Sequence, residues 1–261
     1  MVEALFRELA ALPQIEAIAL GGSRAGEVYD QKSDYDVYLY CTSPIDEAVR
    51  RRILEQYCSR MEIGNHFWEY EDNCVLKNGI DIDLLYRDLD SFAEGLAAVV
   101  ERYQSCNGYT TCMWHNLNTC KILYDRDGRL QAVKDRFAVP YPKPLKEAII
   151  RKNMQLLSDA MPAYQLQIAK AVGRNDLVSI GHRTAAFMES YFDIIWAMNE
   201  RTHPGEKRLI PLCNQQCRIL PADFEENIHR LYADLFTCPD RVNEDIARIV
   251  RELKEVLNEE R

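Results

Sequence analysis

The sequence has no long hydrophobic run and no apolar leader. No stretch approaches the roughly 18 consecutive apolar residues of a membrane-spanning helix. Near the start of the chain, Glu3, Arg7 and Glu8 interrupt the apolar residues, so that nothing there resembles a signal peptide. We therefore expect a cytoplasmic protein that makes no use of a membrane.

The sequence also lacks an excess of basic residues. It has 32 Lys and Arg against 41 Asp and Glu, which gives a formal net charge of −9. A broad nucleic-acid-binding surface needs clustered positive charge, so this balance argues against nucleic acid as a partner. It suits a neutral or cationic partner and is also common in ordinary soluble enzymes.

Three common sequence signatures are missing. The nine cysteines include no Cys-x-x-Cys pair, and their odd number indicates mostly free thiols in a reducing compartment. No Gly-x-x-x-x-Gly-Lys-Ser/Thr element is present, which excludes a P-loop. We find no internal repeat.

What the chain does have is a change of pattern near residue 140. Strand-like and helix-like segments alternate before it, with strands expected at 15–20, 35–40, 66–76 and 80–86 and a helix at 45–61. Three prolines follow at 140–144, a stiff stretch typical of a linker. Only long helical patterns lie beyond it. We predict an α+β domain at 1–140 and an all-α helical bundle at 145–261.

Two pairs of aspartates occur on predicted strands. Asp34 and Asp36 are two residues apart, so on a strand their carboxylates emerge on one face. Such neighbours repel each other, and a divalent cation such as Mg²⁺, which prefers hard oxygen ligands, removes that cost. A third carboxylate from a neighbouring strand would complete a two-metal site. We predict Asp83 for this position, with Asp81 as the alternative on the same face.

A small-residue turn precedes the first pair. Gly21, Gly22 and Ser23 follow the apolar strand 15–20 and are expected to open a helix. Glycines let the backbone approach a ligand closely, and amide groups at a helix start point at anions. Ser23 adds a hydroxyl donor and Arg24 a positive charge. The turn is therefore a candidate phosphate-binding element.

These elements together resemble a known superfamily. Gly22-Ser23, a ten-residue gap, Asp34-Tyr35-Asp36 and a later Ile82-Asp83-Leu84 look like the nucleotidyltransferase superfamily typified by DNA polymerase beta. The runs 21–26, 33–36 and 83–88 resemble its bacterial branch of small-molecule enzymes related to aminoglycoside and lincosamide adenylyltransferases, and 199–208 looks like the helical domain of that branch.

The resemblance implies a mixed sheet with flanking helices. It also implies a Mg²⁺-dependent reaction, with two ions, that moves a nucleoside monophosphate from a nucleoside triphosphate to a hydroxyl of a small molecule such as an antibiotic. We expect ATP to be the donor. Gly22 and Ser23 would hold the β- and γ-phosphates, Asp34 and Asp36 the metals, and Asp83 the catalytic metal and the acceptor hydroxyl.

Two other residues and two other functions belong to this hypothesis. We predict that Arg24 and Lys207, the latter in the loop after Pro204-Gly205, contact the phosphates of the bound nucleotide.

The alternatives to a small-molecule nucleotidyltransferase are a protein-modifying adenylyltransferase and a non-catalytic nucleotide-binding protein. The presence of all three expected carboxylates argues against the non-catalytic alternative.

Overall fold

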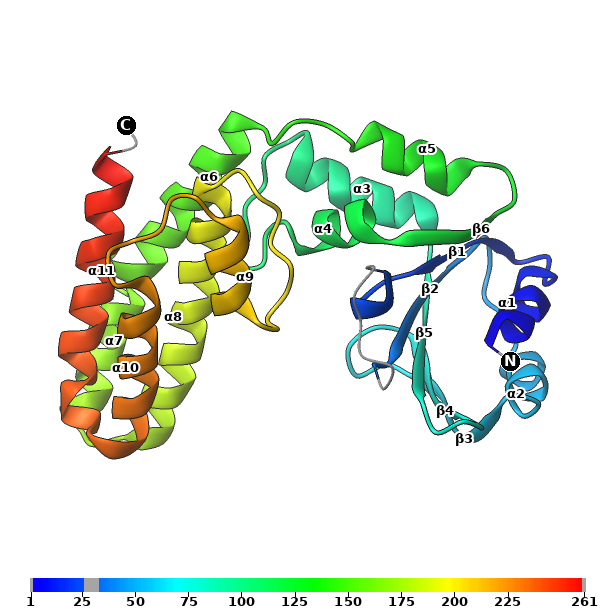
Figure 1. Cartoon of the computed structure of the whole chain (residues 1–261), viewed down its shortest axis with the longest axis horizontal. Helices are drawn as coiled ribbons and strands as arrows, with labels where there is room; N and C mark the ends of the chain where they lie inside the picture. The colour runs from blue at the N-terminus through cyan, green and yellow to red at the C-terminus, as the bar shows by residue number, and fades with distance from the viewer. Residues whose placement is uncertain (1, 26–32, 260–261) are drawn as a thin grey trace. The chain divides into compact units, whose positions relative to one another are not determined.

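The structure is a computed structural model that describes residues 2–25 and 33–259 (Figure 1). Its contacts divide the chain into two compact units. Unit 1 comprises Met1–Ala97 and Asn116–Val139, and unit 2 comprises Ala98–His115 and Pro140–Arg261. The sequence did not reveal that 98–115 packs with the helical unit. There, the backbone N–H of Thr110 donates to buried Asp193 at 3.0 Å and that of Gly108 to buried Asn153 at 3.2 Å. The two-domain division at 1–140 and 145–261 stays a prediction.

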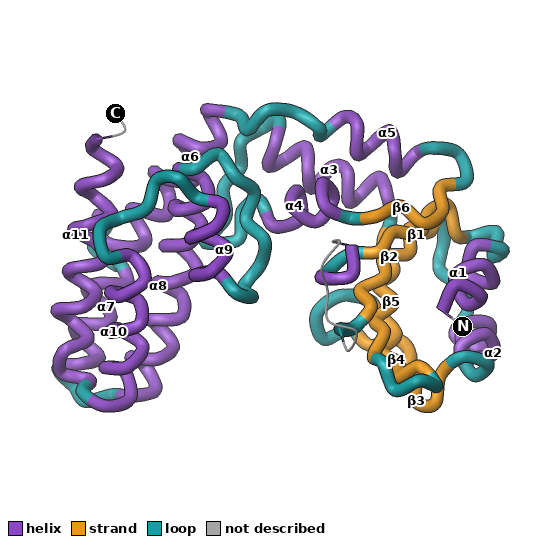
Figure 2. The backbone as a smooth tube through the Cα atoms, in the orientation of Figure 1, coloured by secondary structure: helices purple, strands orange, loops and turns teal. Residues whose placement is uncertain are grey.

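Unit 1 is built on a six-stranded mixed sheet with the order β3-β4-β5-β2-β1-β6 (Figure 2). Strands β2 and β5 pair in parallel, and the other neighbours are antiparallel. The strands span Ile15–Leu20 (β1), Tyr35–Cys41 (β2), Cys58–Asn65 (β3), Glu71–Leu76 (β4), Asp81–Arg87 (β5) and Lys121–Asp125 (β6). The predicted α+β class with a mixed sheet is confirmed.

One face of the sheet carries the apolar core of unit 1. Val37 and Leu39 of β2 pack with Leu84 of β5 against the helices α1 (Val2–Ala10) and α2 (Glu47–Leu54), and all three side chains are fully buried. Figure 1 shows α1 and α2 together on this side of the sheet. Each buried aliphatic side chain contributes about 1.5–3 kcal/mol, so the alternation in β2 fixes which face turns inward.

The other face of the sheet carries the aspartates and two tyrosines of β2. Tyr38 accepts a hydrogen bond from Asn116 Nδ2 at 2.5 Å, and the Tyr40 ring lies 5.6 Å from that of Phe92. Both tyrosines are buried, and burial raises their pKa values. Their end of β2 is therefore covered, whereas Asp34 and Asp36 at the other end are only half-buried.

Two local predictions differ from the structure. The helix expected at 45–61 ends at Leu54, and the chain continues as β3, because residues 58–65 pair with β4 and complete the edge of the sheet. The strand expected at 66–76 begins only at Glu71, because 66–70 form the loop between β3 and β4. The turn after β1 opens a short 3-10 helix at Ser23–Ala25, and residues 26–32 beyond it lie outside the described residues. The tight turn predicted at Asn78-Gly79 is confirmed, with Gly79 at a positive φ of 82°.

Unit 2 is helical, as predicted. Its core surrounds α8 (Leu177–Met198), from which Phe187, Ile194 and Ile195 are fully buried. The surrounding helices are α6 (Lys143–Met154), α7 (Tyr164–Val172), α9 (Leu209–Gln216), α10 (Phe224–Thr237) and α11 (Val242–Glu259). Helices α3 (Leu89–Val100) and α4 (Cys112–Thr119) cross the boundary between the units, and α5 (Arg129–Arg136) belongs to unit 1.

Among the described residues, no helix combines the length and apolar character that crossing a bilayer requires.

Candidate active site

Three of the predicted aspartates lie together at one end of β2 and β5. Asp34 immediately precedes β2, Asp36 lies within it, and Asp83 lies in β5 directly opposite Asp36 in the parallel register. One carboxylate oxygen from each residue lies within 4.8 Å of the other two, and all three residues are half-buried. The parallel pairing thus produces a convergent tricarboxylate cluster from residues nearly fifty positions apart.

The chemistry of this cluster fits a divalent cation. Three carboxylates at such short separations repel one another, and no other group of three His, Cys, Asp or Glu ligands approaches this closely in 2–25 and 33–259. Hard oxygen donors are what Mg²⁺ and Mn²⁺ prefer. Asp34, Asp36 and Asp83 are therefore the residues that would hold such an ion.

The structure separates Asp83 from Asp81. Asp81 lies on the same face of β5 but two residues earlier, where its partner in β4 is Val75, and it is exposed. It does not join the cluster that the described residues form. Of the two alternatives that the sequence left open, the structure brings Asp83 to the other two carboxylates.

The Gly21-Gly22-Ser23 turn packs directly against the cluster. The backbone N–H of Gly21 donates to the carbonyl oxygen of Asp36 at 2.8 Å. Gly22 has a positive φ of 59°, and a Cβ added there would lie 1.8 Å from Asp36 Oδ2. Glycine is thus needed both for the backbone conformation and to leave room for the carboxylate. Ser23 is exposed beside this turn.

Arg24 closes the loop between the turn and the aspartates. Its Nε donates to the carbonyl oxygen of Ser33 at 2.6 Å, and its guanidinium lies 3.9 Å from the centre of the Tyr35 ring. These contacts hold together the two ends of the predicted polar loop, whose residues 26–32 lie outside the described residues. A phosphate contact by Arg24 stays a prediction.

Two asparagines that sequence reasoning missed support Asp83. Asn73 of β4 lies opposite Asp83 and donates from Nδ2 to Asp83 Oδ1 at 2.8 Å, while Asn65 of β3 donates to Asn73 Oδ1 at 2.5 Å. A carboxylate accepts but does not donate, so Asp83 fixes which end of the Asn73 amide faces it. The register that places Asn73 opposite Asp83 could not be read from the sequence, and the Asn65–Asn73 contact spans an irregularity in the β3–β4 pairing.

Lys207 is far from the three aspartates in sequence and belongs to unit 2, whereas the aspartates belong to unit 1. It is exposed in the turn before α9, next to Arg208, which has a positive φ of 57°. Among the described residues of unit 2, no contact of Lys207 defines a role for it. Its contact with the nucleotide stays a prediction.

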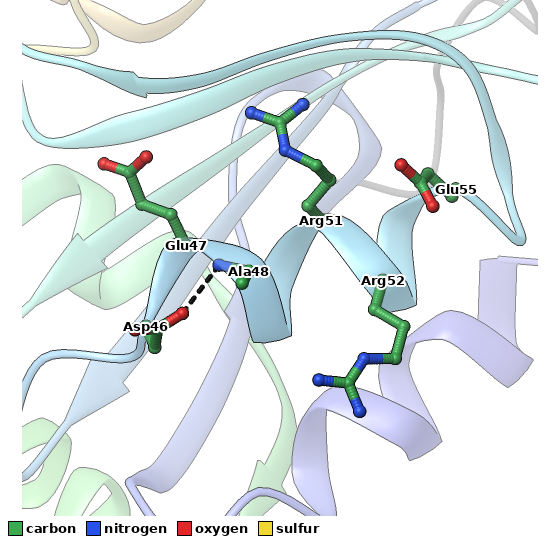
Figure 3. A pocket seen from close by; sticks show the side chains of 6 residues that line it. All are labelled: Asp46, Glu47, Ala48, Arg51, Arg52 and Glu55. Atoms are coloured by element: carbon green, nitrogen blue, oxygen red, sulfur yellow. Dashed lines mark hydrogen bonds between the residues drawn. The ribbon is translucent and has the colours of Figure 1, made fainter.

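A hollow on the outer surface of α2 is a separate feature of unit 1. It measures about 600 Å³ and is lined by Asp46, Glu47, Ala48, Arg51, Arg52 and Glu55 (Figure 3). Asp46 caps the helix by accepting from the N–H of Ala48 at 2.7 Å. None of the predicted site residues lines this hollow, so we assign it no part in the candidate site.

Residues 110–209 match the model of a family described as a domain of unknown function, DUF4037. The matched segment is less than half of the chain, and Asp34, Asp36 and Asp83 lie outside it. No curated protein matches the sequence significantly.

Solved structures were compared as well. A nucleotidyltransferase-like protein from Exiguobacterium sibiricum 255-15 is 11% identical, with a TM-score of 0.45, over 99% of this chain and 75% of that chain. An aminoglycoside 6-adenyltransferase from Bacillus subtilis is 11% identical, with a TM-score of 0.32, over 99% of this chain and 90% of that one.

Proposed function

We propose that this protein is a Mg²⁺-dependent nucleotidyltransferase that moves a nucleoside monophosphate, AMP by preference, from a nucleoside triphosphate to a hydroxyl of a small molecule. The observation that carries the proposal is the convergence of the Asp34, Asp36 and Asp83 oxygens within 4.8 Å of one another. The cluster lies against a glycine turn whose own Gly22 leaves space for Asp36 Oδ2. A carboxylate cluster beside a phosphate-binding turn is the arrangement that phosphoryl-transfer chemistry uses.

Each residue has a defined task in this proposal. Asp34, Asp36 and Asp83 would hold Mg²⁺, which when bound neutralises charge on the phosphates and orients them. Gly22 and Ser23 hold the β- and γ-phosphates with backbone and hydroxyl donors. Arg24 and Lys207 are proposed to contact the same phosphates.

The acceptor reacts beside Asp83. The hydroxyl oxygen of the acceptor attacks the α-phosphorus of the nucleotide. The bond between this phosphorus and the oxygen that bridges it to the β-phosphate breaks, and pyrophosphate leaves. Asn73 engages Oδ1 of Asp83. We assign Oδ2 to the acceptor hydroxyl, which Asp83 orients and from which it accepts the proton.

Pyrophosphate release tests the proposal directly. The purified full chain is incubated with Mg²⁺, each of the four NTPs and a panel of aminoglycosides, lincosamides and hydroxylated metabolites. We expect release with one NTP and at least one acceptor, and a loss of more than about 100-fold in Asp34→Asn and Asp36→Asn.

Asp81→Asn is the matched control, because it removes the same charge from an exposed position on β5 outside the cluster. It should retain release within about twofold of the unaltered protein, since it breaks no contact of the cluster. Full release by Asp36→Asn, or equal losses in Asp36→Asn and Asp81→Asn, would contradict the assignment of the cluster.

A further inference from the structure

The β3–β4 hairpin lies on the flank of the carboxylates that faces away from the glycine turn. Across the sheet, the order runs from β1, which leads into Gly22, through β2 and β5 to β4 and β3. Asp36 pairs with Asp83, and Asp83 in turn pairs with Asn73. The carboxylate cluster therefore separates the turn from the hairpin within unit 1.

This order has a consequence for the direction from which the acceptor arrives. In an in-line displacement, the attacking and leaving oxygens lie on opposite sides of the transferred phosphorus. With the leaving pyrophosphate held at Gly22 and Ser23, the acceptor hydroxyl approaches from the side of β5 and β4. The surface that unit 1 offers on that side is the β3–β4 hairpin.

The tip of this hairpin carries two adjacent, strongly exposed aromatic side chains. Phe67 is 81% exposed and Trp68 is 89% exposed. In the part of unit 1 that the structure describes, the other large apolar side chain that is more than a third exposed is Val139, at 43%. Single exposed apolar residues are common, whereas two exposed aromatic residues in succession form a candidate binding surface.

The residues on either side of the pair are held in place. The His66 and Tyr70 rings stack with their centres 4.6 Å apart. Arg87 of β5 donates to Glu69 from Nε at 2.8 Å and from Nη2 at 2.6 Å. The backbone of the tip is thus anchored to the strand that carries Asp83, and the two exposed rings project from a fixed loop.

We propose that Phe67 and Trp68 form the platform of the acceptor site and stack on the flat apolar face of a ring in a hydroxylated acceptor. The proposal rests on the function proposed above. Arg87 lies four residues beyond Asp83, or about 13 Å along the strand at ~3.3 Å per residue. An acceptor that reacts at Asp83 and also reaches the tip held by Arg87 must therefore extend over more than one ring unit, and the net charge of −9 favours a neutral or cationic one.

Tryptophan fluorescence gives a direct readout of this site. The chain has three tryptophans, of which Trp114 and Trp196 are 2% and 1% exposed. A ligand that shields Trp68 therefore shifts the emission of the exposed fluorophore. The probes are kanamycin A and lincomycin as extended hydroxylated molecules, methyl α-D-glucoside as a single ring unit, and MgATP and pyrophosphate as donor-side ligands.

We expect kanamycin A or lincomycin to shift the emission, and methyl α-D-glucoside, MgATP and pyrophosphate to leave it unchanged. For an acceptor that supports pyrophosphate release, Trp68→Ala should raise KM about five- to twentyfold and leave kcat within about twofold, because stacking on a remote ring contributes equally to ground and transition states. Trp68→Phe should restore most of the loss. Phe236→Ala, which removes an aromatic side chain that is 85% exposed in unit 2, is the matched control and should change neither constant.

The outcomes distinguish this inference from the proposed function. A shift of Trp68 emission by MgATP alone would assign the tip to the nucleobase and overturn the inference, as would the absence of a shift with every extended probe. Pyrophosphate release with an unchanged KM in Trp68→Ala would refute the platform and leave the function standing. A shift with kanamycin A without pyrophosphate release from any acceptor would refute the function and, with it, the role of Phe67 and Trp68 in binding an acceptor.

Discussion

Replacing Gly22 with alanine should disrupt the carboxylate cluster at a moderate cost in stability. The added Cβ would lie 1.8 Å from Asp36 Oδ2, whereas ordinary contact for a Cβ begins at 3.4 Å. The oxygen must therefore retreat by about 1.6 Å, the difference between the two values, because interiors do not tolerate such overlap. Asp36 shares its oxygens with a cluster that spans only 4.8 Å, so a movement of this size breaks the arrangement.

The expected effects differ in size. A displacement on the order of 1 Å in a catalytic group can cost about 100-fold in rate. The left-handed backbone conformation at φ 59° costs a non-glycine residue about 1–2 kcal/mol. We predict that Gly22→Ala lowers both Mn²⁺ affinity and pyrophosphate release by about 100-fold or more, and lowers the free energy of unfolding by about 1–2 kcal/mol.

Gly79→Ala is the control for backbone strain. Gly79 has a positive φ of 82°, but nothing lies within 4 Å of an added Cβ. It should lose a similar amount of stability in urea denaturation and keep the Mn²⁺ affinity measured by electron paramagnetic resonance. If Gly22→Ala binds Mn²⁺ as tightly as Gly79→Ala, the contact with Asp36 has no functional meaning and the reasoning is refuted.

Three further predictions concern support and stability. Asn73→Ala should weaken Mn²⁺ binding about 10- to 100-fold, because Asp83 loses the donor that orients it, and a calorimetric titration measures this. Asp72→Ala should lower the free energy of unfolding by about 3–5 kcal/mol in urea, because it leaves the fully buried Arg50 guanidinium without its partner at 2.5 Å. Burial raises the pKa of Asp193 to about 6. Since the unfolded value is about 3.9, the folded protein binds more protons between these values, and its stability should fall as pH rises through that window. Urea denaturation measures the free energy of unfolding at each pH, and its decrease between about pH 4 and 6 should be smaller in Asp193→Asn than in the unaltered protein.

Local patterns predicted the parts of the fold that local rules determine. The alternation of Val37 and Leu39 with Asp36 and Tyr38 gave the inward and outward faces of β2, because a strand with one apolar face has one stable orientation. The Asn78-Gly79 turn joined β4 to β5 because it supplies the positive φ that a tight hairpin requires. The paired aspartates at 34 and 36 were visible for the same reason of spacing.

Features that depend on pairing between distant strands were beyond the sequence. The sequence analysis preferred Asp83 to Asp81 but left both open, because the parallel register that places Asp83 opposite Asp36 is encoded by no local pattern. The support from Asn73 depends on the same register. The helix expected at 45–61 was too long because the helical spacing continued past Leu54, where tertiary pairing with β4 outweighs local preference.

Binding of Mn²⁺ to the purified chain tests the central claim most directly. Mn²⁺ is titrated into the full chain and followed by electron paramagnetic resonance, alongside Asp36→Asn, Asp83→Asn and the control Asp81→Asn. The account predicts binding by the unaltered protein and by Asp81→Asn, and a loss of at least about tenfold in affinity when either cluster carboxylate is neutralised. Equal affinity in all four proteins, or no binding by the unaltered protein in the presence of a nucleoside triphosphate, would contradict it.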